Sequence, residues 1–457
     1  MAKKEDKSRF SRLLGLMENV EGDKVIWMIA LVLIMVSIIA ISSSTSLLAL
    51  SSGTTREVII RKHIIVSLLG LGLIVGIYNI KNLKVMEMAA KMGFFVSFAL
   101  LLFLDLHIKL PFARAEYINQ AWRTINILGL QLHVFEVVKV AMVMYMAWAV
   151  DAYQEDQKGH PAYKLVYKFK DVRFLNWFTT DLGKKFFYIY IPMMVICVMI
   201  IGGSMSSALF IGGVMFVTLF VGGLDMKEMT LMFLLAIVLV GAIIGIHFAS
   251  GGRYFDHVGS AVKRVGMSPE EELVDAVGTD KFEDVLGRTQ QPLGAKLAVS
   301  EGGLLGKGPG RSTQKYVVPV IFADYMFAFI TEEYGILGAL LIITLYAALL
   351  ARGSIVARNC DDNFAKTTIA GLVVLISGQA LMHMLVNVGI GPLTGQALPM
   401  ISDGKTSFLC FSVAFGVILS ISRGARRKVE KEVSRTAPIM ETGGDDLRAS
   451  LDELDNI

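Results

Sequence analysis

The chain has 457 residues, 54% of them hydrophobic and 18% charged, with 44 Lys and Arg against 40 Asp and Glu. A soluble globular domain carries about 25% charged residues, so this composition excludes an ordinary soluble protein. The formal net charge of +4 gives no sign of a nucleic-acid partner, and none is expected.

Apolar segments close to the roughly 20 residues that cross a bilayer recur along most of the chain. Isolated strands cannot satisfy their backbone groups in hydrocarbon, so these segments are predicted to be helices. The polar lead through Lys24 is too long for a typical signal peptide, and the first segment is expected to remain as a span. The ten predicted spans cover residues 25–43, 63–80, 88–106, 135–153, 186–201, 206–222, 231–249, 334–350, 364–388 and 408–421.

Lys and Arg gather before the first predicted span and after the second, fourth, eighth and tenth. Because basic residues are retained on the cytoplasmic side of short loops, both termini are expected in the cytoplasm. One large extracytoplasmic loop, residues 250–321, then lies between helices 7 and 8, and loops of this length are usually functional or disordered. The prediction is an all-α polytopic membrane protein with a cytoplasmic N-terminal segment (1–24), a membrane domain of about ten transmembrane helices (25–421) and a disordered cytoplasmic tail (422–457).

Glu136 and Lys139 lie three residues apart at the start of the fourth span, so on a helix they share a face and can neutralise each other. Ionisable residues within a membrane are costly and by default mark function. Two interpretations stay open. A structural ion pair that fixes helix packing is favoured over direct binding of a charged substrate group.

Asp324 lies among aromatic and aliphatic residues where the long outer loop meets the eighth span. A carboxylate in such surroundings tends to have a raised pKa, which suits a general base. The competing interpretation, which the residues alone favour, is that Asp324 caps a helix beginning at Tyr325. Glu332 and Glu333 follow, but eight helical residues separate Glu332 from Asp324 by about 12 Å, too far for a close carboxylate pair.

Two glycine-rich segments lie on either side of spans eight and nine. In residues 302–315, glycines let backbone amides approach an anion, and Lys307, Arg311 and Lys315 could offset phosphate charge. Taken alone, this segment is better explained as a flexible turn with solvated charges. In residues 387–407, Gly and Pro at membrane depth suit irregular backbone that lines a cavity. The three cysteines lack metal-ligand or disulfide spacing, and no metal ligand is assigned.

Together these segments resemble the SEDS family of bacterial cell-wall polymerases, which includes FtsW, RodA and SpoVE. The resemblance covers nearly the whole membrane domain and leans toward the FtsW type, because both ends of the chain are extended. It is carried by residues 300–315, 324–335 and 379–407, the last with Pro392, Gly395, Leu398, Pro399, Ser402 and Gly404, and by Arg123, Glu136 and Lys139.

The chain departs from the usual family pattern at four places. Residues 133–135 read His-Val-Phe where the family usually has Gln-Pro-Ser, and residues 203–207 read Gly-Ser-Met-Ser-Ser in place of Gln-Pro-Asp-Leu-Gly. His383 replaces a frequent Asn, and Asp403 and Lys405 are introduced into a Ser-Tyr-Gly-Gly-Ser-Ser pattern. These departures suggest a divergent lineage and leave the donor-site residues open.

The resemblance implies a peptidoglycan glycosyltransferase that polymerises lipid II, an undecaprenyl-pyrophosphate-linked disaccharide peptide, at the outer face of the bacterial cytoplasmic membrane. It implies that Asp324 deprotonates the acceptor hydroxyl, which attacks the donor anomeric carbon with inversion. The departing pyrophosphate would be stabilised by basic side chains or by a divalent cation, Mg or Mn. The substrate-binding residues are expected to be Lys307, Arg311, Lys315, Arg123, Glu136, Lys139, Glu332, Ser402 and Lys405.

The resemblance also implies partners: a class B penicillin-binding protein as transpeptidase, and other proteins of the division or elongation machinery. Two further functions stay open. The chain could be a transporter that flips lipid II, in which Glu136 and Lys139 would act within the bilayer. It could also be a noncatalytic scaffold that recruits the transpeptidase through its spans and charged tail.

Overall fold

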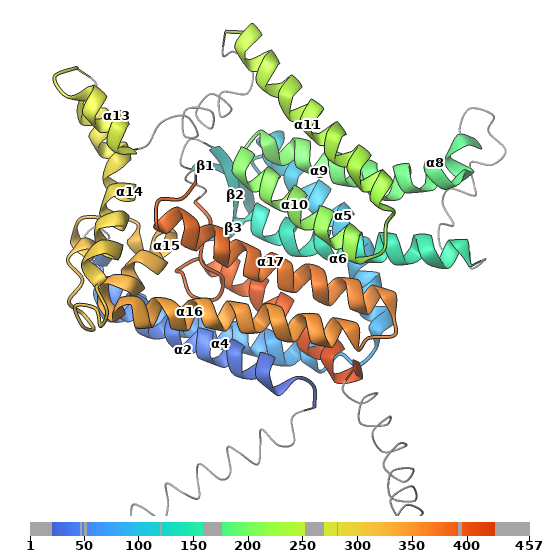
Figure 1. Ribbon diagram of the computed structural model, residues 1–457, viewed down its shortest axis with the longest axis horizontal. Coiled ribbons are helices and arrows are strands. Elements are labelled where there is room, and N and C mark those ends of the chain that lie inside the picture. Colours follow the sequence, from blue (N-terminus) through green and yellow to red (C-terminus); the bar gives the residue numbers. More distant parts are fainter. Residues whose placement is uncertain are drawn as a thin grey trace, which may run out of the picture.

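The computed structural model describes residues 21–45, 48–49, 53–118, 121–158, 176–251, 269–280, 282–391 and 395–425. The chain is mostly helical there, and the long helices pack together as a bundle (Figure 1). Residues 1–20 and 426–457, which make up most of the two predicted cytoplasmic ends, lie outside the described residues, as do Pro392 and the segment 159–175.

Each of the ten predicted apolar segments overlaps a helix, and the all-α polytopic membrane class is confirmed. Within the described residues, eight helices are long and apolar enough to cross a membrane. The other two overlapping helices are α6, which carries Glu136 and Lys139, and α10, which has 17 residues. The helices are α2 (Lys24–Ser44), α4 (Arg56–Tyr78), α5 (Leu83–Asp105), α6 (Val134–Gln157), η1 (Asn176–Thr179), α8 (Asp181–Lys185) continuing through the π-helical η2 (Phe186–Tyr190) into α9 (Ile191–Ile201), α10 (Met205–Val221), α11 (Met226–Ala249), α16 (Met326–Arg358), α17 (Asn363–Asn387) and a final helix, Lys405–Ala425.

A three-stranded antiparallel sheet between α5 and α6 departs from the purely helical expectation. Ala115 and Ile125 pair across the first two strands and are buried against the bundle. On the other face, Glu116 accepts hydrogen bonds from the side-chain amides of Asn126 at 2.8 Å and Gln131 at 3.1 Å. A sheet with one apolar and one polar face has no continuous apolar run, which is why hydropathy did not indicate it. In spatial order the strands are β1 (Ala113–Ile118), β2 (Ala121–Ile127) and β3 (Leu130–His133).

The eighth predicted span, residues 334–350, is part of the longer helix α16. Its additional N-terminal turns contain Glu332 and Glu333, whose charges end the apolar run in the sequence. Both side chains are fully buried, because the preceding segment folds over them. That segment, which was predicted only as a long loop, contains α13 (Pro269–Ala276), α14 (Phe282–Gly302), η3 (Gln314–Tyr316) and α15 (Ile321–Asp324).

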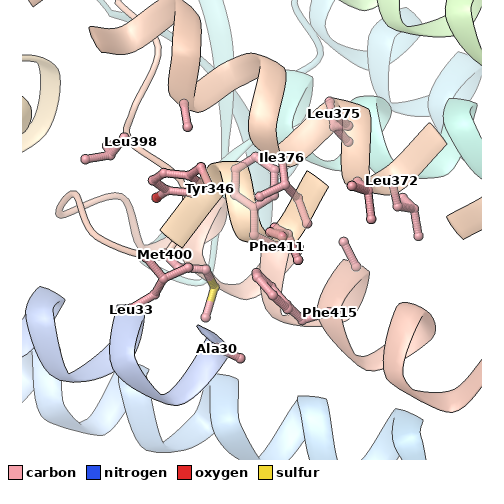
Figure 2. Close-up of a cluster of buried hydrophobic side chains, with 14 of the residues drawn as sticks. Ala30, Leu33, Tyr346, Leu372, Leu375, Ile376, Leu398, Met400, Phe411 and Phe415 are labelled. Carbon is pink, nitrogen blue, oxygen red and sulfur yellow. The ribbon is translucent and has the colours of Figure 1, made fainter. Parts of the chain in front are cut away.

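Two clusters of buried apolar side chains form the core. One joins α2, α16, α17 and the final helix, and Figure 2 shows Leu33, Tyr346 and Phe411 within it. The Tyr346 hydroxyl donates a hydrogen bond to the backbone oxygen of Pro399, which ties this cluster to the loop 395–404. The second cluster joins α5, α6, α9 and α10. The loop 395–404 is therefore attached to the first cluster.

The turn between β2 and β3 places Leu128 at φ 52° and Gly129 at φ 89°, the backbone of a type I′ turn. Leu128 is 83% exposed, and leucine is strained there whereas asparagine adopts this backbone readily. We expect Leu128→Asn to stabilise the protein by about 0.5–1 kcal/mol, measured as a higher melting temperature in detergent. Leu130→Asn, at an exposed strand position, is the matched control and should give no increase. A lower melting temperature for Leu128→Asn would contradict the turn assignment.

Candidate active site

The first glycine-rich segment, residues 302–315, is called the glycine-rich loop. It docks on a bend in α16. The helix is kinked at Gly335, whose φ is 67°, just after the backbone carbonyl oxygens of Glu332 and Glu333. The loop supplies their partners: the N–H of Lys307 donates to the oxygen of Glu332 and the N–H of Gly308 to the oxygen of Glu333, each at 2.9 Å. The loop and the bend therefore depend on each other for their backbone hydrogen bonds.

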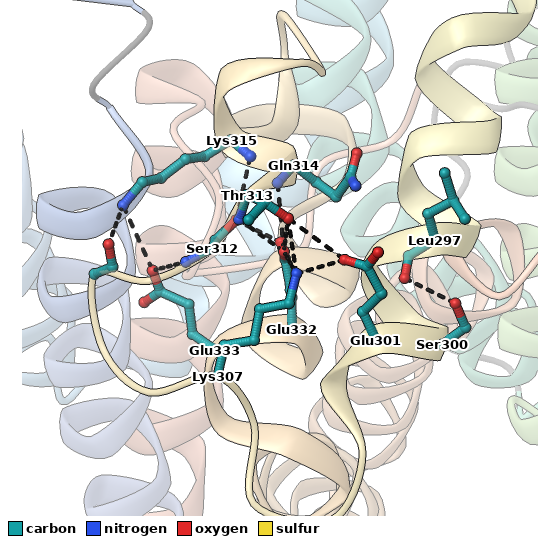
Figure 3. A network of polar contacts seen from close by, with 11 residues as sticks. Leu297, Ser300, Glu301, Lys307, Ser312, Thr313, Gln314, Lys315, Glu332 and Glu333 are labelled. Carbon is teal, nitrogen blue, oxygen red and sulfur yellow. Dashed lines mark hydrogen bonds and ion pairs between the residues drawn. The ribbon is translucent and has the colours of Figure 1, made fainter.

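The Glu332 carboxylate is the centre of a polar network under this loop (Figure 3). Its Oε1 accepts hydrogen bonds from Lys307 Nζ at 2.7 Å and from the N–H and hydroxyl of Thr313 at 2.8 and 2.9 Å. Its Oε2 accepts from the Ser312 hydroxyl. Lys307 also donates to Glu301 and Thr313, so its three N–H groups all have acceptors. Partial burial lowers the pKa of Lys307, but its bonds to Glu301 and Glu332 outweigh this effect and raise that pKa.

Glu333 joins the loop to α2. Its Oε1 accepts a hydrogen bond from the Ser43 hydroxyl at 2.7 Å. The same oxygen lies 3.8 Å from Lys315 Nζ (Figure 3). Lys315 is buried and donates to the carbonyl oxygen of Gly310 at 2.7 Å. Arg311, in contrast, is exposed, and its side chain forms no ion pair within the described residues. Of the three cations predicted to face phosphate, two are thus engaged in holding the loop.

Asp324 is the last residue of α15, and its side chain is half-buried. The N-cap of α16 is Tyr325, and no side chain caps the helix from that position, so the capping interpretation of Asp324 does not describe the structure. Burial raises the pKa of the Asp324 carboxyl, and the positive charge of Arg123 on β2 opposes part of that rise. The result is a carboxylate outside the helical core, with a raised pKa and a cation nearby.

Lys139 is 1% exposed and joins α6 to α17 and to the loop 395–404. Its Nζ donates to Oε1 of Glu136 at 2.6 Å, of Gln379 at 2.6 Å and of Gln396 at 2.8 Å. The Ser407 hydroxyl donates to Glu136 Oε2 at 3.0 Å. Sequence reasoning missed the two glutamines, because they lie 240 and 257 residues away along the chain. All three N–H groups of Lys139 have acceptors, as expected of a residue that fixes helix packing.

Two of the segments that depart from the family pattern, residues 133–135 and 203–207, meet in space. A Cβ atom on Gly203 would lie 2.7 Å from the ring of Phe135, so these two departures pack against each other. The Ser207 hydroxyl accepts a hydrogen bond from Gln396 Nε2 at 2.9 Å. Asp403 lies 3.7 Å from Nδ1 of His63 on α4. The family pattern usually has an aspartate near residue 205, and this chain has Asp403 instead in another segment. The two positions are therefore in different surroundings.

The remaining predicted residues lie in the loop before the final helix and at its start. Ser402 is buried, and its hydroxyl accepts the N–H of Leu398 at 3.0 Å, which stabilises the loop backbone. Lys405 is exposed at the first residue of the final helix.

A metal site is not preformed in the described part of the chain, where no three His, Cys, Asp or Glu side chains gather at coordinating distance. Glu332 and Glu333 already accept hydrogen bonds from the glycine-rich loop. The roles considered below are therefore those of the side chains.

Comparison with known proteins identifies the family and supports the fold. Residues 23–427 match the model of the FtsW, RodA and SpoVE family, described as "Cell cycle protein". A solved structure from work on "structural coordination of polymerization and crosslinking by a peptidoglycan synthase complex" superposes with a TM-score of 0.57. It is 18% identical and covers 88% of this chain and 98% of that chain, so it supports the fold.

Two curated relatives match parts of the chain. The probable peptidoglycan glycosyltransferase FtsW of Caulobacter vibrioides is 33% identical over 175 residues, which cover 38% of this chain and 41% of the relative. The stage V sporulation protein E of Bacillus subtilis is 33% identical over 199 residues, which cover 41% of this chain and 54% of the relative. The matched stretch thus spans about half the length of these relatives.

The contact between the loop and α16 predicts the effect of a single methyl group. A Cβ atom on Gly335 would lie 2.4 Å from the carbonyl oxygen of Leu304, and its φ is unfavourable for alanine. We expect Gly335→Ala to destabilise the protein by about 2–4 kcal/mol, measured by thermal unfolding in detergent. Gly76→Ala, in a helix with open space around the new methyl group, is the control and should not destabilise. Equal melting temperatures for the two variants would contradict the docking of the loop.

Proposed function

The chain belongs to the FtsW, RodA and SpoVE family of cell cycle proteins, and from that premise we propose that it polymerises lipid II into glycan strands at the outer face of the cytoplasmic membrane. The observation that carries the proposal is Asp324, a half-buried carboxylate with a raised pKa beside Arg123. The name of the Caulobacter relative, a probable peptidoglycan glycosyltransferase, supports it.

In the proposed reaction, the Asp324 carboxylate takes the proton from the acceptor sugar hydroxyl. The resulting oxygen nucleophile attacks the anomeric carbon of the donor lipid II with inversion. The bond between that carbon and the phosphate oxygen breaks, and undecaprenyl pyrophosphate leaves with the electron pair. A base with a raised pKa accepts the proton more readily than an ordinary carboxylate does, provided that it is still ionised at the working pH.

Two exposed cations are proposed to face the leaving pyrophosphate. Arg311 is free of ion pairs within the described loop, and Lys405 begins the final helix, where the helix dipole adds positive potential. Lys307 and Lys315 instead pair with Glu332 and Glu333 and so hold the loop to α16, which keeps Arg311 in place. Among the basic residues predicted to bind substrate, Lys307 and Lys315 are thus assigned to holding the loop, and Arg311 and Lys405 to binding phosphate.

A class B penicillin-binding protein is the proposed partner, which the solved peptidoglycan synthase complex of similar fold supports. Both termini are proposed to lie in the bacterial cytoplasm. For a lipid II flippase, Glu136 and Lys139 were the expected actors, but the three N–H groups of Lys139 already have protein acceptors. Polymerisation is therefore preferred over transport. Location of the tagged chain at midcell or along the side wall distinguishes division from elongation.

Replacement of the proposed base tests the reaction directly. We expect Asp324→Asn to lower the rate of lipid II polymerisation at least about a hundredfold, because the amide accepts no proton. Glycan chains are measured on a gel after the protein, with its transpeptidase, is supplied with labelled lipid II. Asp280→Asn, an exposed acid of the same outer loop, is the matched control and should retain the native rate. Equal product from Asp324→Asn and the native protein would remove Asp324 from the mechanism.

The pH dependence follows from the surroundings of Asp324. Activity should be lost as the pH falls and Asp324 becomes protonated, with a midpoint above the ordinary carboxyl range because burial raises its pKa. Arg123→Gln removes a charge that lowers the pKa of Asp324. The acidic limb of the pH–activity profile, where activity falls as Asp324 is protonated, should therefore move to higher pH. Arg123→Lys keeps the positive charge and should move the acidic limb less than Arg123→Gln does. An acidic limb that is unchanged in Arg123→Gln would show that the two groups are not coupled.

A further inference from the structure

The first turn of α16 is held by side chains from α17 and not by a residue of its own N-terminus. The first N–H groups of a helix have no partner within the helix, and Tyr325 at the N-cap supplies none. His383 Nε2 accepts the N–H of Phe327 at 3.3 Å, and Asn387 Oδ1 accepts the N–H of Ala328 at 2.9 Å. Two residues one helical turn apart on α17 therefore cap α16 from outside.

Asn387 also holds Asp324 itself. Its Nδ2 donates to the backbone oxygen of Asp324 at 3.1 Å and to the backbone oxygen of His383 at 2.8 Å. Asn387 is fully buried, so these bonds are not in competition with water. One amide group thus connects the residue before the α16 N-cap, the first turn of α16 and the last turn of α17.

The second capping residue links this junction to the polar network of α6. Because His383 Nε2 accepts a hydrogen bond, the proton of the neutral ring is on Nδ1, which donates to the Gln396 backbone oxygen at 2.7 Å. The Gln396 side chain in turn accepts from Lys139. From the same loop, the N–H of Asp403 donates to the backbone oxygen of Phe322 in α15 at 3.0 Å. The short helix that ends in Asp324 is thereby fixed on both sides.

We propose that Asn387, supported by His383, is a positioning residue for Asp324. It keeps the carboxylate half-buried and at a fixed distance from Arg123, and it does so through the backbone of Asp324. This inference rests on the proposed role of Asp324 as general base. If the capping bonds are lost, the first turn of α16 frays and water reaches the carboxylate, so the pKa of Asp324 falls toward its ordinary value.

The direction of that pKa change separates positioning from a merely structural role. In Asn387→Leu, which removes both the acceptor and the donor at similar volume, kcat should fall roughly ten- to a hundredfold while KM for lipid II stays close to native. The acidic limb of the pH profile should move to lower pH, opposite to the shift expected for Arg123→Gln. A structural defect alone would lower the amount of folded protein without moving the limb.

His383 and Ser377 supply the second variant and the control. His383→Leu removes the acceptor for Phe327 and should shift the limb in the same direction, whereas His383→Gln, whose amide can still accept, should recover part of the native rate. The Ser377 hydroxyl donates a hydrogen bond to the backbone oxygen of Tyr346 at 3.2 Å. This bond also joins α17 to α16 but lies within the helical core. Ser377→Ala therefore tests loss of an interhelical bond and should leave the pH profile unchanged.

The outcomes distinguish this inference from the function on which it rests. If Asp324→Asn is inactive but both Asn387→Leu and His383→Leu keep the native kcat and acidic limb, positioning is excluded and the general base stands. If Asp324→Asn keeps the native rate, Asp324 is removed from the mechanism, and if the native protein with its transpeptidase makes no glycan chains, the proposed function itself is excluded. If Asn387→Leu yields no folded protein, the two His383 variants decide, and an unshifted limb in His383→Leu overturns the inference.

Discussion

Two carboxylates buried side by side on α16 are the constraint on which the fold of the glycine-rich loop depends. Glu332 and Glu333 are both 0% exposed, and buried charges are tolerated only when they are paired and hydrogen-bonded. The partners come from the glycine-rich loop and, through Ser43, from α2. The loop must therefore fold onto the helix, and the bend at Gly335 makes room for it.

Because of this constraint, residues of the same charge in neighbouring segments have different roles. Lys307 and Lys315 compensate the buried carboxylates, so their charge is used within the protein, while Arg311 on the same loop remains exposed. Among the acids, Glu332 is saturated with donors, whereas Asp324 is half-buried beside Arg123. The proposed chemistry is thus assigned to the groups that the fold leaves available.

The sequence predicted the parts of the fold that depend on local hydropathy. All ten apolar segments became helices, but the start of α16 was placed too late, because Glu332 and Glu333 interrupt the apolar run and their burial depends on a loop about twenty residues earlier. The sheet at residues 113–133 was missed because its strands alternate in polarity. Asp324 was proposed from its apolar surroundings and the family resemblance, and its catalytic role stays a prediction. The glutamines bonded to Lys139 and the α17 side chains that cap α16 depend on long-range contacts that spacing cannot reveal.

The central claim is that Asp324 meets the acceptor sugar of a lipid-linked substrate at the junction of α15, α16 and α17. The most direct measurement is an experimental structure of the protein with its transpeptidase and a nonhydrolysable lipid II analogue. The account predicts a sugar hydroxyl within hydrogen-bond reach of the Asp324 carboxylate, about 3 Å, and the pyrophosphate near Arg311. A sugar bound at the cytoplasmic ends of the helices, or separated from Asp324 by packed side chains, would contradict it.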